Sequence, residues 1–295
     1  MRSYIVTCCS TVDLSRQQME ELGIPYVSFH YYMDDKDYLD DLYQSTTPEA
    51  FFRMIEEGAQ PVTSQLSPEE YMEFWRPYLE EGRDILHITL SSGISGTFGS
   101  ANLAKNLILE EYPDRQIEVV DSLAASSGYG MLVVSARENQ LAGMSLSDNL
   151  AWIMDHRNQL HHWFFSTDLT SYIRGGRVSK VSGFFGQMLN ICPLLNVNCE
   201  GKLIPREKCR GKKKVIRTIF SRMQDHAQDG AHYHGKVYMS HSASQAEAEA
   251  VAALVREAYP EMEGEIIINP IGTVIGSHTG PGTVALFFWG DERTE

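Results

Sequence analysis

The chain has 295 residues, of which 43% are hydrophobic and 22% charged, which is typical of a globular protein with one large or two medium domains. Its formal net charge of −14 disfavours general binding to nucleic acid or anionic membrane, because both would repel it. It has no run of about 18 apolar residues, so we predict no membrane span and no stable membrane anchor. The first residues are too quickly polar for a signal peptide, and five cysteines without a C-x-x-C pair favour a reducing cytoplasm.

The first half of the chain alternates short apolar runs with helical patterns, as a parallel sheet covered by helices requires. Two helix starts are clearly marked, by Thr47-Pro48-Glu49 and by the capping box Ser67-Pro68-Glu69-Glu70. A hairpin over 30–41 would turn at Asp34-Asp35-Lys36. The predicted strands are 3–7, 25–29, 85–90 and 117–120, and the predicted helices end near residues 23, 58, 82, 111 and 141.

The composition shifts near residue 160, where a second block begins with His-His-Trp-Phe-Phe. We predict strands over 191–196, 202–208, 237–240, 265–268 and 283–289, with helices around 215–223 and over 243–258. The predicted fold is therefore two α/β domains, 1–160 and 161–295, with mainly parallel sheets and a ligand cleft between them.

Ser91-Ser-Gly-Ile-Ser-Gly-Thr97 follows a predicted strand and precedes a helix. Free backbone N–H groups at a helix N-terminus favour an anion, and glycines allow a ligand to approach closely. Ser95 would hydrogen-bond a carboxylate oxygen, with Ser92 as a possible substitute. The alternative is that these hydroxyls only cap the helix.

Two further segments also offer polar side chains for an anion-binding site. Thr63 would supply a second hydroxyl to the same anion, unless it only bonds its own backbone in a turn. His278 lies in the stretch His-Thr-Gly-Pro-Gly, which we interpret as a glycine-rich loop. A protonated His278 would add positive charge to a site otherwise made of neutral hydroxyls.

Basic residues are concentrated in two places. Arg174-Gly-Gly-Arg177 suggests a docking face for a phosphate-bearing partner, because we find no packing reason for the paired glycines. The basic run over 206–214 is equally well explained as solvated surface or as a docking face. The apolar stretch over 184–191 is either core or the wall of an alkyl tunnel.

The sequence lacks several catalytic signatures, among them the P-loop, the dinucleotide fingerprint after the first strand and the H-E-x-x-H zinc motif. We therefore expect no metal and no cofactor. Gly93-Ile-Ser95-Gly96-Thr97 approximates the G-x-S-x-G elbow of hydrolases, so a serine hydrolase with Ser95 as nucleophile and His278 as base is the alternative function. A regulator that senses a lipid through domain closure is a third hypothesis.

Taken together, the ordered set of motifs resembles the DegV family over essentially the whole chain. The motifs are Thr63-Ser64-Gln65 with Ser67-Pro68, Ser91 to Thr97, Asp121-Ser122, Arg174-Gly-Gly-Arg177, Gly201-Lys-Leu-Ile-Pro205 with Arg210-Gly211, and His278-Thr-Gly-Pro-Gly282. Ile94 and Phe98-Gly99 depart from the common pattern without touching the head-group donors.

The resemblance implies a non-enzymatic, cytoplasmic bacterial carrier that binds a long-chain fatty acid, such as palmitate, stearate or oleate, in a buried interdomain tunnel. It implies that Thr63 and Ser95 hold the carboxylate, with His278 close by. In some members the protein presents the acid to a separate kinase, which forms an acyl phosphate. Arg174 would then contact that kinase or the phosphate.

Overall fold

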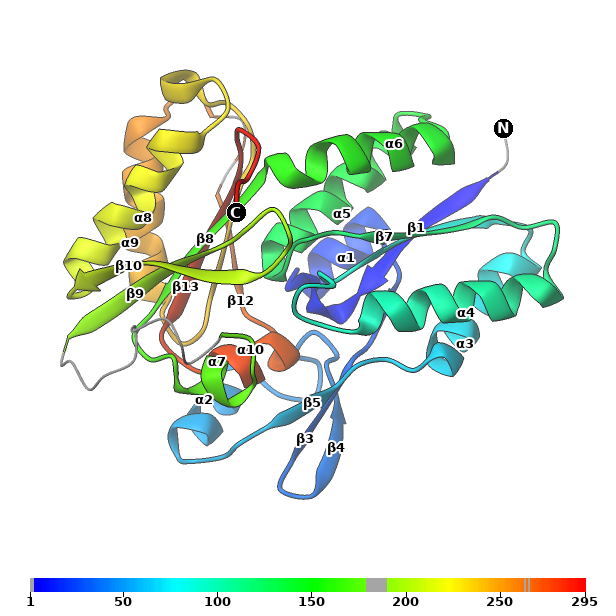
Figure 1. Ribbon diagram of the computed structural model, residues 1–295, viewed down its shortest axis with the longest axis horizontal. Coiled ribbons are helices and arrows are strands. Elements are labelled where there is room, and N and C mark those ends of the chain that lie inside the picture. The colour runs from blue at the N-terminus through cyan, green and yellow to red at the C-terminus, as the bar shows by residue number, and fades with distance from the viewer. Residues whose placement is uncertain (1–2, 179–189, 263, 265) are drawn as a thin grey trace.

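The computed structural model describes residues 3–178, 190–262, 264 and 266–295. Two sheets stand side by side, each with helices on its outer face, and a layer of helices lies between them (Figure 1). The predicted α/β class is therefore confirmed. Within the described residues, no helix is long and apolar enough to cross a membrane.

The N-terminal sheet has four strands in the order β2-β1-β6-β7, all paired in parallel, as the alternating pattern predicted. Helices α3 and α4 cover one face, and α5 and α6 pack on the other. Both faces of β1 and β6 are buried, which explains their unbroken apolar runs. The elements are β1 (Tyr4–Cys9), α1 (Arg16–Leu22), β2 (Tyr26–Val27), α3 (Pro68–Glu80), β6 (Asp84–Thr89), α4 (Thr97–Glu111), β7 (Ile117–Asp121), α5 (Ser126–Leu141) and α6 (Leu146–His156).

The C-terminal sheet has six strands in the order β10-β9-β8-β13-β11-β12, and only the β11–β12 pair is parallel among the described strands. The expectation of mainly parallel pairing is wrong for this sheet. The connection from β9 to β10 is too short for a parallel crossover, which needs a dozen or more residues. The elements are β8 (Leu160–Ser166), α7 (Thr170–Arg174), β9 (Ile191–Val197), β10 (Leu203–Arg210), α8 (Lys212–His226), β11 (Val237–His241), α9 (Gln245–Ala258), β12 (Ile267–Pro270), α10 (Thr273–Thr279) and β13 (Thr283–Trp289).

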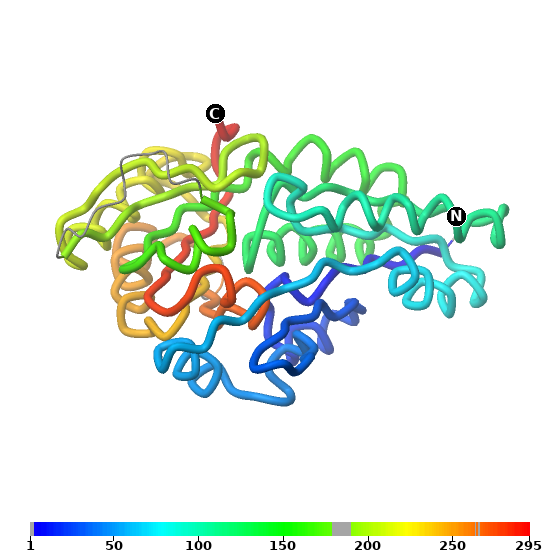
Figure 2. Tube along the Cα trace, turned by 60° about the horizontal axis from the view of Figure 1, so that its bottom comes forward, coloured from blue at the N-terminus to red at the C-terminus, as the bar shows by residue number. Residues whose placement is uncertain are grey.

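A small antiparallel sheet, in the order β4-β3-β5, contains the predicted hairpin. Asp34 and Asp35 form its turn with φ of 52° and 59°, the left-handed region that such tight hairpin turns require. Figure 2 shows this blue part of the chain passing beneath the rest of the molecule towards the red C-terminal segment, where α10 contacts α2, β3 and β5. The elements are β3 (His30–Met33), β4 (Lys36–Leu39), α2 (Pro48–Glu56) and β5 (Val62–Ser64).

Helix α5 is shared between the two large sheets, because it contacts β1 on one side and β8, β11 and β13 on the other. Gly128 makes the second contact possible: a Cβ there would lie 2.5 Å from both His162 Nε2 and Phe287 Cδ1. The N-terminal end of α5 therefore reaches the inner face of the C-terminal sheet. The ligand cavity described below opens at this junction.

Candidate ligand-binding site

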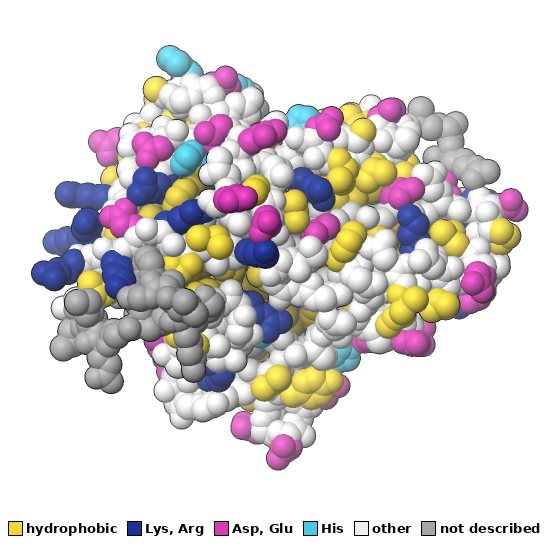
Figure 3. All heavy atoms as spheres, in the orientation of Figure 1, with side chains coloured by type: hydrophobic (Ala, Val, Ile, Leu, Met, Phe, Trp, Pro, Cys, Tyr) yellow, Lys and Arg dark blue, Asp and Glu magenta, His cyan; other side chains and the backbone are white. Residues whose placement is uncertain are grey.

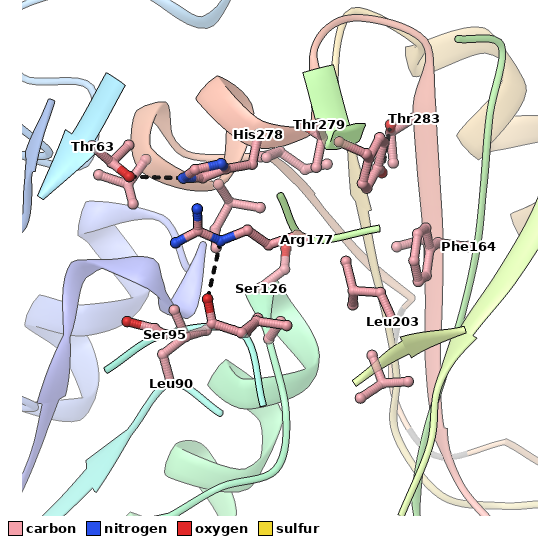
Figure 4. Close-up of a pocket in the computed structure, with 18 of the residues that line it drawn as sticks. Thr63, Leu90, Ser95, Ser126, Phe164, Arg177, Leu203, His278, Thr279 and Thr283 are labelled. Atoms are coloured by element: carbon pink, nitrogen blue, oxygen red, sulfur yellow. Dashed lines mark hydrogen bonds between the residues drawn. The ribbon is translucent and has the colours of Figure 1, made fainter. Parts of the chain in front are cut away.

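A cavity of about 270 Å³ lies between the inner face of the C-terminal sheet and the loops at the carboxyl end of the N-terminal sheet. Its walls are mostly apolar, and a group of polar side chains is gathered at one side (Figure 4). Ligand pockets commonly combine apolar walls with a few placed polar groups. The polar group contains Thr63, Ser95, Arg177 and His278, and the apolar walls include Phe29, Leu90, Ile94, Phe164, Val197, Leu203, Ile271, Val274, Ile275, Ala285 and Phe287.

Thr63 and His278 meet although 215 residues separate them in the chain. Thr63 lies on β5, and its Oγ1 is 2.7 Å from His278 Nε2. His278 is in the last turn of α10, so the predicted loop is wrong at this position. Burial, together with the charges of Arg177 and Arg174, lowers the pKa of His278 to about 4. The predicted protonated histidine is therefore incorrect, since the imidazole is neutral at pH 7.

The positive charge in the cavity comes from Arg177, which sequence reasoning did not select. Its Nε donates to Ile94 O at 3.0 Å and its Nη1 to Gly175 O at 2.5 Å. Figure 4 shows its guanidinium between His278 and Ser95. Nη2 has no hydrogen-bond partner in the described part of the chain. The arginine is thus fixed by two backbone carbonyls and keeps a terminal nitrogen for a ligand.

Gly175 has a packing role that we did not foresee. A Cβ at this residue would lie 2.2 Å from His278 Nδ1, so only glycine lets α7 approach α10 this closely. Gly176 has a φ of +71°, a conformation that favours glycine. The paired glycines therefore belong to the fold as well as to any docking face, which corrects our statement that they lack a packing reason.

The serine loop contributes Ser95 and the N-terminus of α4 to the cavity. Ser95 Oγ accepts a hydrogen bond from Thr97 N, the first N–H of α4, at 3.3 Å, and Ser95 lines the cavity. Ser92, the possible substitute, is exposed, and its N–H donates to Asp121 Oδ1. Among the cavity-lining residues Ser95 is present and Ser92 is not, which favours Ser95 as the carboxylate donor.

Arg174 lies outside the cavity. It is exposed at the C-terminal end of α7 and is absent from the lining residues. Its charge is nevertheless close enough to lower the pKa of His278. Arg174 is therefore placed next to the polar side of the cavity, where a partner could reach it.

Helix α10 is held at its start by two buried carboxyl groups that sequence reasoning also missed. Asp13 Oδ1 accepts from Gly272 N at 2.9 Å, and Asp40 Oδ1 accepts from Thr273 Oγ1 at 2.9 Å. Burial raises the pKa of Asp13 well above its usual value and also raises that of Asp40. Asp13 also bonds the hydroxyl of Ser126, a residue of the cavity wall. The same network thus fixes α10 and one edge of the cavity.

The arrangement does not favour a serine hydrolase. His278 Nε2 is bonded to Thr63 rather than to Ser95, and no carboxylate within the described residues orients His278 Nδ1. A nucleophile needs both a base within hydrogen-bond reach and a group that orients the base.

A possible metal-binding cluster, unexpected from sequence spacing, lies away from the cavity. His161, His226 and Asp291 bring their ligand atoms within 4.8 Å of one another. The two imidazole rings are stacked at 4.8 Å with an angle of only 21° between their planes. A metal ion should lie near the plane of each coordinating ring, about 2 Å from its nitrogen, and near-parallel stacked rings do not allow one ion to satisfy both. These residues do not fit a tight metal site.

The predicted basic run follows β10 and the start of α8, where Figure 3 shows Lys and Arg side chains gathered at the left edge. Lys212 pairs with Glu247 at 2.6 Å, and Lys214 lies 3.8 Å from Glu207. Such exposed pairs contribute little to stability. Part of this surface is therefore charge-neutralised. The predicted apolar stretch over 184–191, apart from its last residues, lies outside the described residues.

Comparisons with known proteins show which family the chain and its fold resemble. A "DegV domain-containing protein" of Clostridium perfringens is 34% identical over 293 residues, covering 99% of each chain. A "Fatty acid-binding protein" of Thermotoga maritima is 32% identical over 280 residues, covering 93% of each. A solved DegV family protein from Thermus thermophilus, described by its fatty acid binding, superimposes with a TM-score of 0.86 at 33% identity, over 99% of this chain and 100% of that one.

The sequence model of the family described as "Uncharacterised protein, DegV family" matches residues 5–291, nearly the whole chain. Four of the motifs that suggested the resemblance contribute to the lining of one cavity, through Thr63, Ser95, Arg177 and His278. The chain belongs to the DegV family.

Proposed function

We propose that this protein binds a long-chain fatty acid in the cavity, with its carboxylate at Thr63, Ser95 and Arg177 and its alkyl chain against the apolar walls. The observation that carries the proposal is the mostly apolar cavity with Thr63, Ser95 and Arg177 gathered at one side. Fatty acid binding by the relatives from Thermotoga maritima and Thermus thermophilus supports it. Palmitate, stearate and oleate are suitable test ligands.

Neutral His278 can carry its hydrogen on either ring nitrogen, and we propose the tautomer in which Nε2 carries it. With Nε2 protonated, His278 donates to Thr63 Oγ1 across 2.7 Å. The Thr63 hydroxyl then keeps its own hydrogen for a ligand oxygen. His278 is thus a positioning residue that orients Thr63 towards the carboxylate, and it needs no charge to do so.

Arg177 supplies the charge that a buried carboxylate requires. An isolated carboxylate is strongly disfavoured in an apolar site, because it loses its hydration. The guanidinium of Arg177 is held beside Ser95 and His278 and stays positive, although burial lowers its pKa. Burial of about fourteen methylenes, at ~0.8 kcal/mol each, supplies most of the gross binding free energy. The polar groups set the orientation of the acid.

Binding of oleate to delipidated protein, measured by titration calorimetry, tests the proposal. We expect Thr63→Val and Ser95→Ala each to weaken affinity by about 1–3 kcal/mol, because a buried charge loses a donor. Ser92→Ala is the matched control, since Ser92 is exposed outside the cavity and its substitution should leave affinity unchanged. Wild-type affinity in both Thr63→Val and Ser95→Ala would refute the head-group assignment.

The proposal extends to a partner. The protein acts as a cytoplasmic carrier that presents the acid to a separate kinase, which phosphorylates the carboxylate. The exposed position of Arg174 beside the polar side of the cavity supports a role in that contact. A fatty-acid kinase from a bacterium with a DegV protein, supplied with ATP and Mg²⁺, should form acyl phosphate that hydroxylamine traps. Arg174→Ala should slow the formation of trapped acyl phosphate without changing oleate affinity. Lys213→Ala, on the remote basic run, is the control and should leave the rate of acyl-phosphate formation unchanged.

A further inference from the structure

The small sheet β4-β3-β5 has an exposed apolar surface on its outer face. Tyr32, Leu39 and Val62 are 43%, 49% and 64% exposed. Tyr32 pairs with Val62 of β5, so their side chains lie side by side on one face. Leu39 pairs with His30, two positions before Tyr32 and therefore on the same face. Tyr32, Leu39 and Val62, which we call the apolar patch, form a cluster of the kind that marks interaction sites.

The face that carries the apolar patch is fixed by the packing of the opposite face. Tyr31 and Met33 alternate with Tyr32 along β3 and are buried. The Tyr31 ring contacts Phe51 of α2 edge to face, with centroids 5.5 Å apart. β3 is also paired on both sides, with β4 and β5. The patch is therefore a surface that a partner finds already formed.

Carboxylates surround the apolar patch. Residues 34–37 carry three carboxylates against one lysine. Asp34 and Asp35 are exposed and have no ion-pair partner within the described residues. Asp37 Oδ1 lies 3.2 Å from His30 Nδ1, and Glu70 Oε1 lies 2.7 Å from His30 Nε2. Figure 3 shows hydrophobic side chains over this hairpin, with Asp and Glu side chains at its tip. The surface around the patch is therefore acidic.

The charge of this surface selects among the possible occupants. A second copy of the chain would bring the same carboxylates together, because a two-fold interface joins identical surfaces. Nucleic acid and anionic membrane would also be repelled, as the net charge of −14 indicates for the whole chain. The complementary partner is a protein with apolar side chains at the centre of its contact surface and lysine or arginine around them.

β5 connects the apolar patch to the polar side of the cavity. Val62 is followed by Thr63, the proposed carboxylate donor, whose side chain faces the opposite way. Ser64 pairs with His30 in the sheet, and both Ser64 and Gln65 line the cavity. A partner seated on the patch therefore lies next to the strand that holds the head-group end of the ligand.

We propose that the apolar patch is the docking surface for the fatty-acid kinase, which would contact it through apolar side chains surrounded by basic ones. This inference rests on the proposed function and on its kinase partner. The kinase must reach the carboxylate, and the patch adjoins the polar side of the cavity. Burial of Tyr32, Leu39 and Val62 would hold the two proteins together, and the nearby carboxylates would steer their encounter.

The test measures steady-state formation of acyl phosphate as the concentration of oleate-loaded protein is varied, with kinase, ATP and Mg²⁺ held constant. Val62→Lys and Leu39→Lys each place a cation against the basic surface of the partner. We expect each to raise the KM for the loaded protein about tenfold while kcat stays near its wild-type value. Leu103→Lys is the matched control, because Leu103 is 52% exposed on α4, outside the patch, and the KM should not change. Added salt should raise the wild-type KM, and it should raise the KM of Asp35→Asn by a smaller factor.

The outcomes separate this inference from the proposed function. A wild-type KM in both Val62→Lys and Leu39→Lys would overturn the inference and leave the proposed function standing. If wild type binds no oleate, the proposed function fails and the inference with it. If wild type binds oleate but no acyl phosphate forms, fatty acid binding stands and the kinase is not the occupant of the patch. Calorimetric oleate affinity and thermal melting check that each variant is folded, and Tyr32→Ser replaces a lysine variant that is not.

Discussion

Replacing Gly175 by alanine should disable the polar group of the cavity with a single methyl group. Gly175 adopts φ −74° and ψ −7°, which alanine accepts without strain. Its Cβ would lie 2.2 Å from His278 Nδ1, whereas real Cβ contacts are essentially never under 3.0 Å. The ring must therefore move by at least 0.8 Å, the difference of those distances. A displacement of that size compresses, lengthens or bends the 2.7 Å bond from His278 to Thr63, whose geometry tolerates much less.

The expected result is a loss of about 1–3 kcal/mol in oleate affinity, which is roughly 5- to 150-fold, because Thr63 loses the donor that orients it. Calorimetric titration gives the affinity, and thermal melting shows whether the fold is retained. Gly176→Ala is the matched control. A Cβ at residue 176 would have no atom within 4 Å, but the φ of +71° at this residue is a conformation that alanine rarely adopts. That variant should lose stability and keep affinity. Wild-type affinity in Gly175→Ala would refute the reasoning that the Thr63–His278 bond holds the site.

Three further predictions concern charge. Arg177→Gln should weaken oleate binding at least tenfold while leaving affinity for the corresponding fatty alcohol nearly unchanged, as competition binding would show; equal losses for both ligands would contradict a charge role. Because the pKa of His278 is lowered from 6.5 to about 4, the unfolded chain binds the proton first, and the free energy of unfolding should fall as pH drops through that window. Urea titrations at several pH values give the free energy of unfolding as a function of pH. Its slope should be shallower in His278→Asn than in wild type by up to about 1.4 kcal/mol per pH unit, and an unchanged slope would show that the pKa of His278 is not lowered. The raised pKa of Asp13 has the opposite sign. The native state keeps a proton that the unfolded state loses above pH 3.8, so wild type should lose stability relative to Asp13→Asn as pH rises above 3.8. A constant difference between the two proteins would show that the pKa of Asp13 is not raised.

The parts of the fold that follow local rules were predictable from sequence. The capping box at Ser67 and the Pro48 start are present as predicted, because both depend on residues within one turn. The pairing direction of the strands in the C-terminal sheet was not predictable, because apolar runs show that a strand is buried but not which neighbour it pairs with. The short turn between β9 and β10, with Gly201 at φ +74°, was the available signal for an antiparallel pair.

The candidate site was likewise predictable only in part from the sequence. Small residues and hydroxyls identified Thr63, Ser95 and His278, and the structure places all three on one cavity. Arg177 was visible in its motif, but only the backbone path shows that it points into the cavity and that Arg174 does not. The state of His278 depends on its burial, which no spacing reveals, and it led us to expect a cation where the ring is neutral.

The bond between Thr63 and His278 also has a consequence for how the chain is made. Its two partners are 215 residues apart, so Thr63 is synthesised long before His278. A nascent or truncated chain that ends before α10 lacks this half of the site, whatever else has already folded. The Thr63–His278 pair would therefore form only after α10 has been synthesised. A ligand held through this pair would then distinguish a chain that contains α10 from one that ended before it.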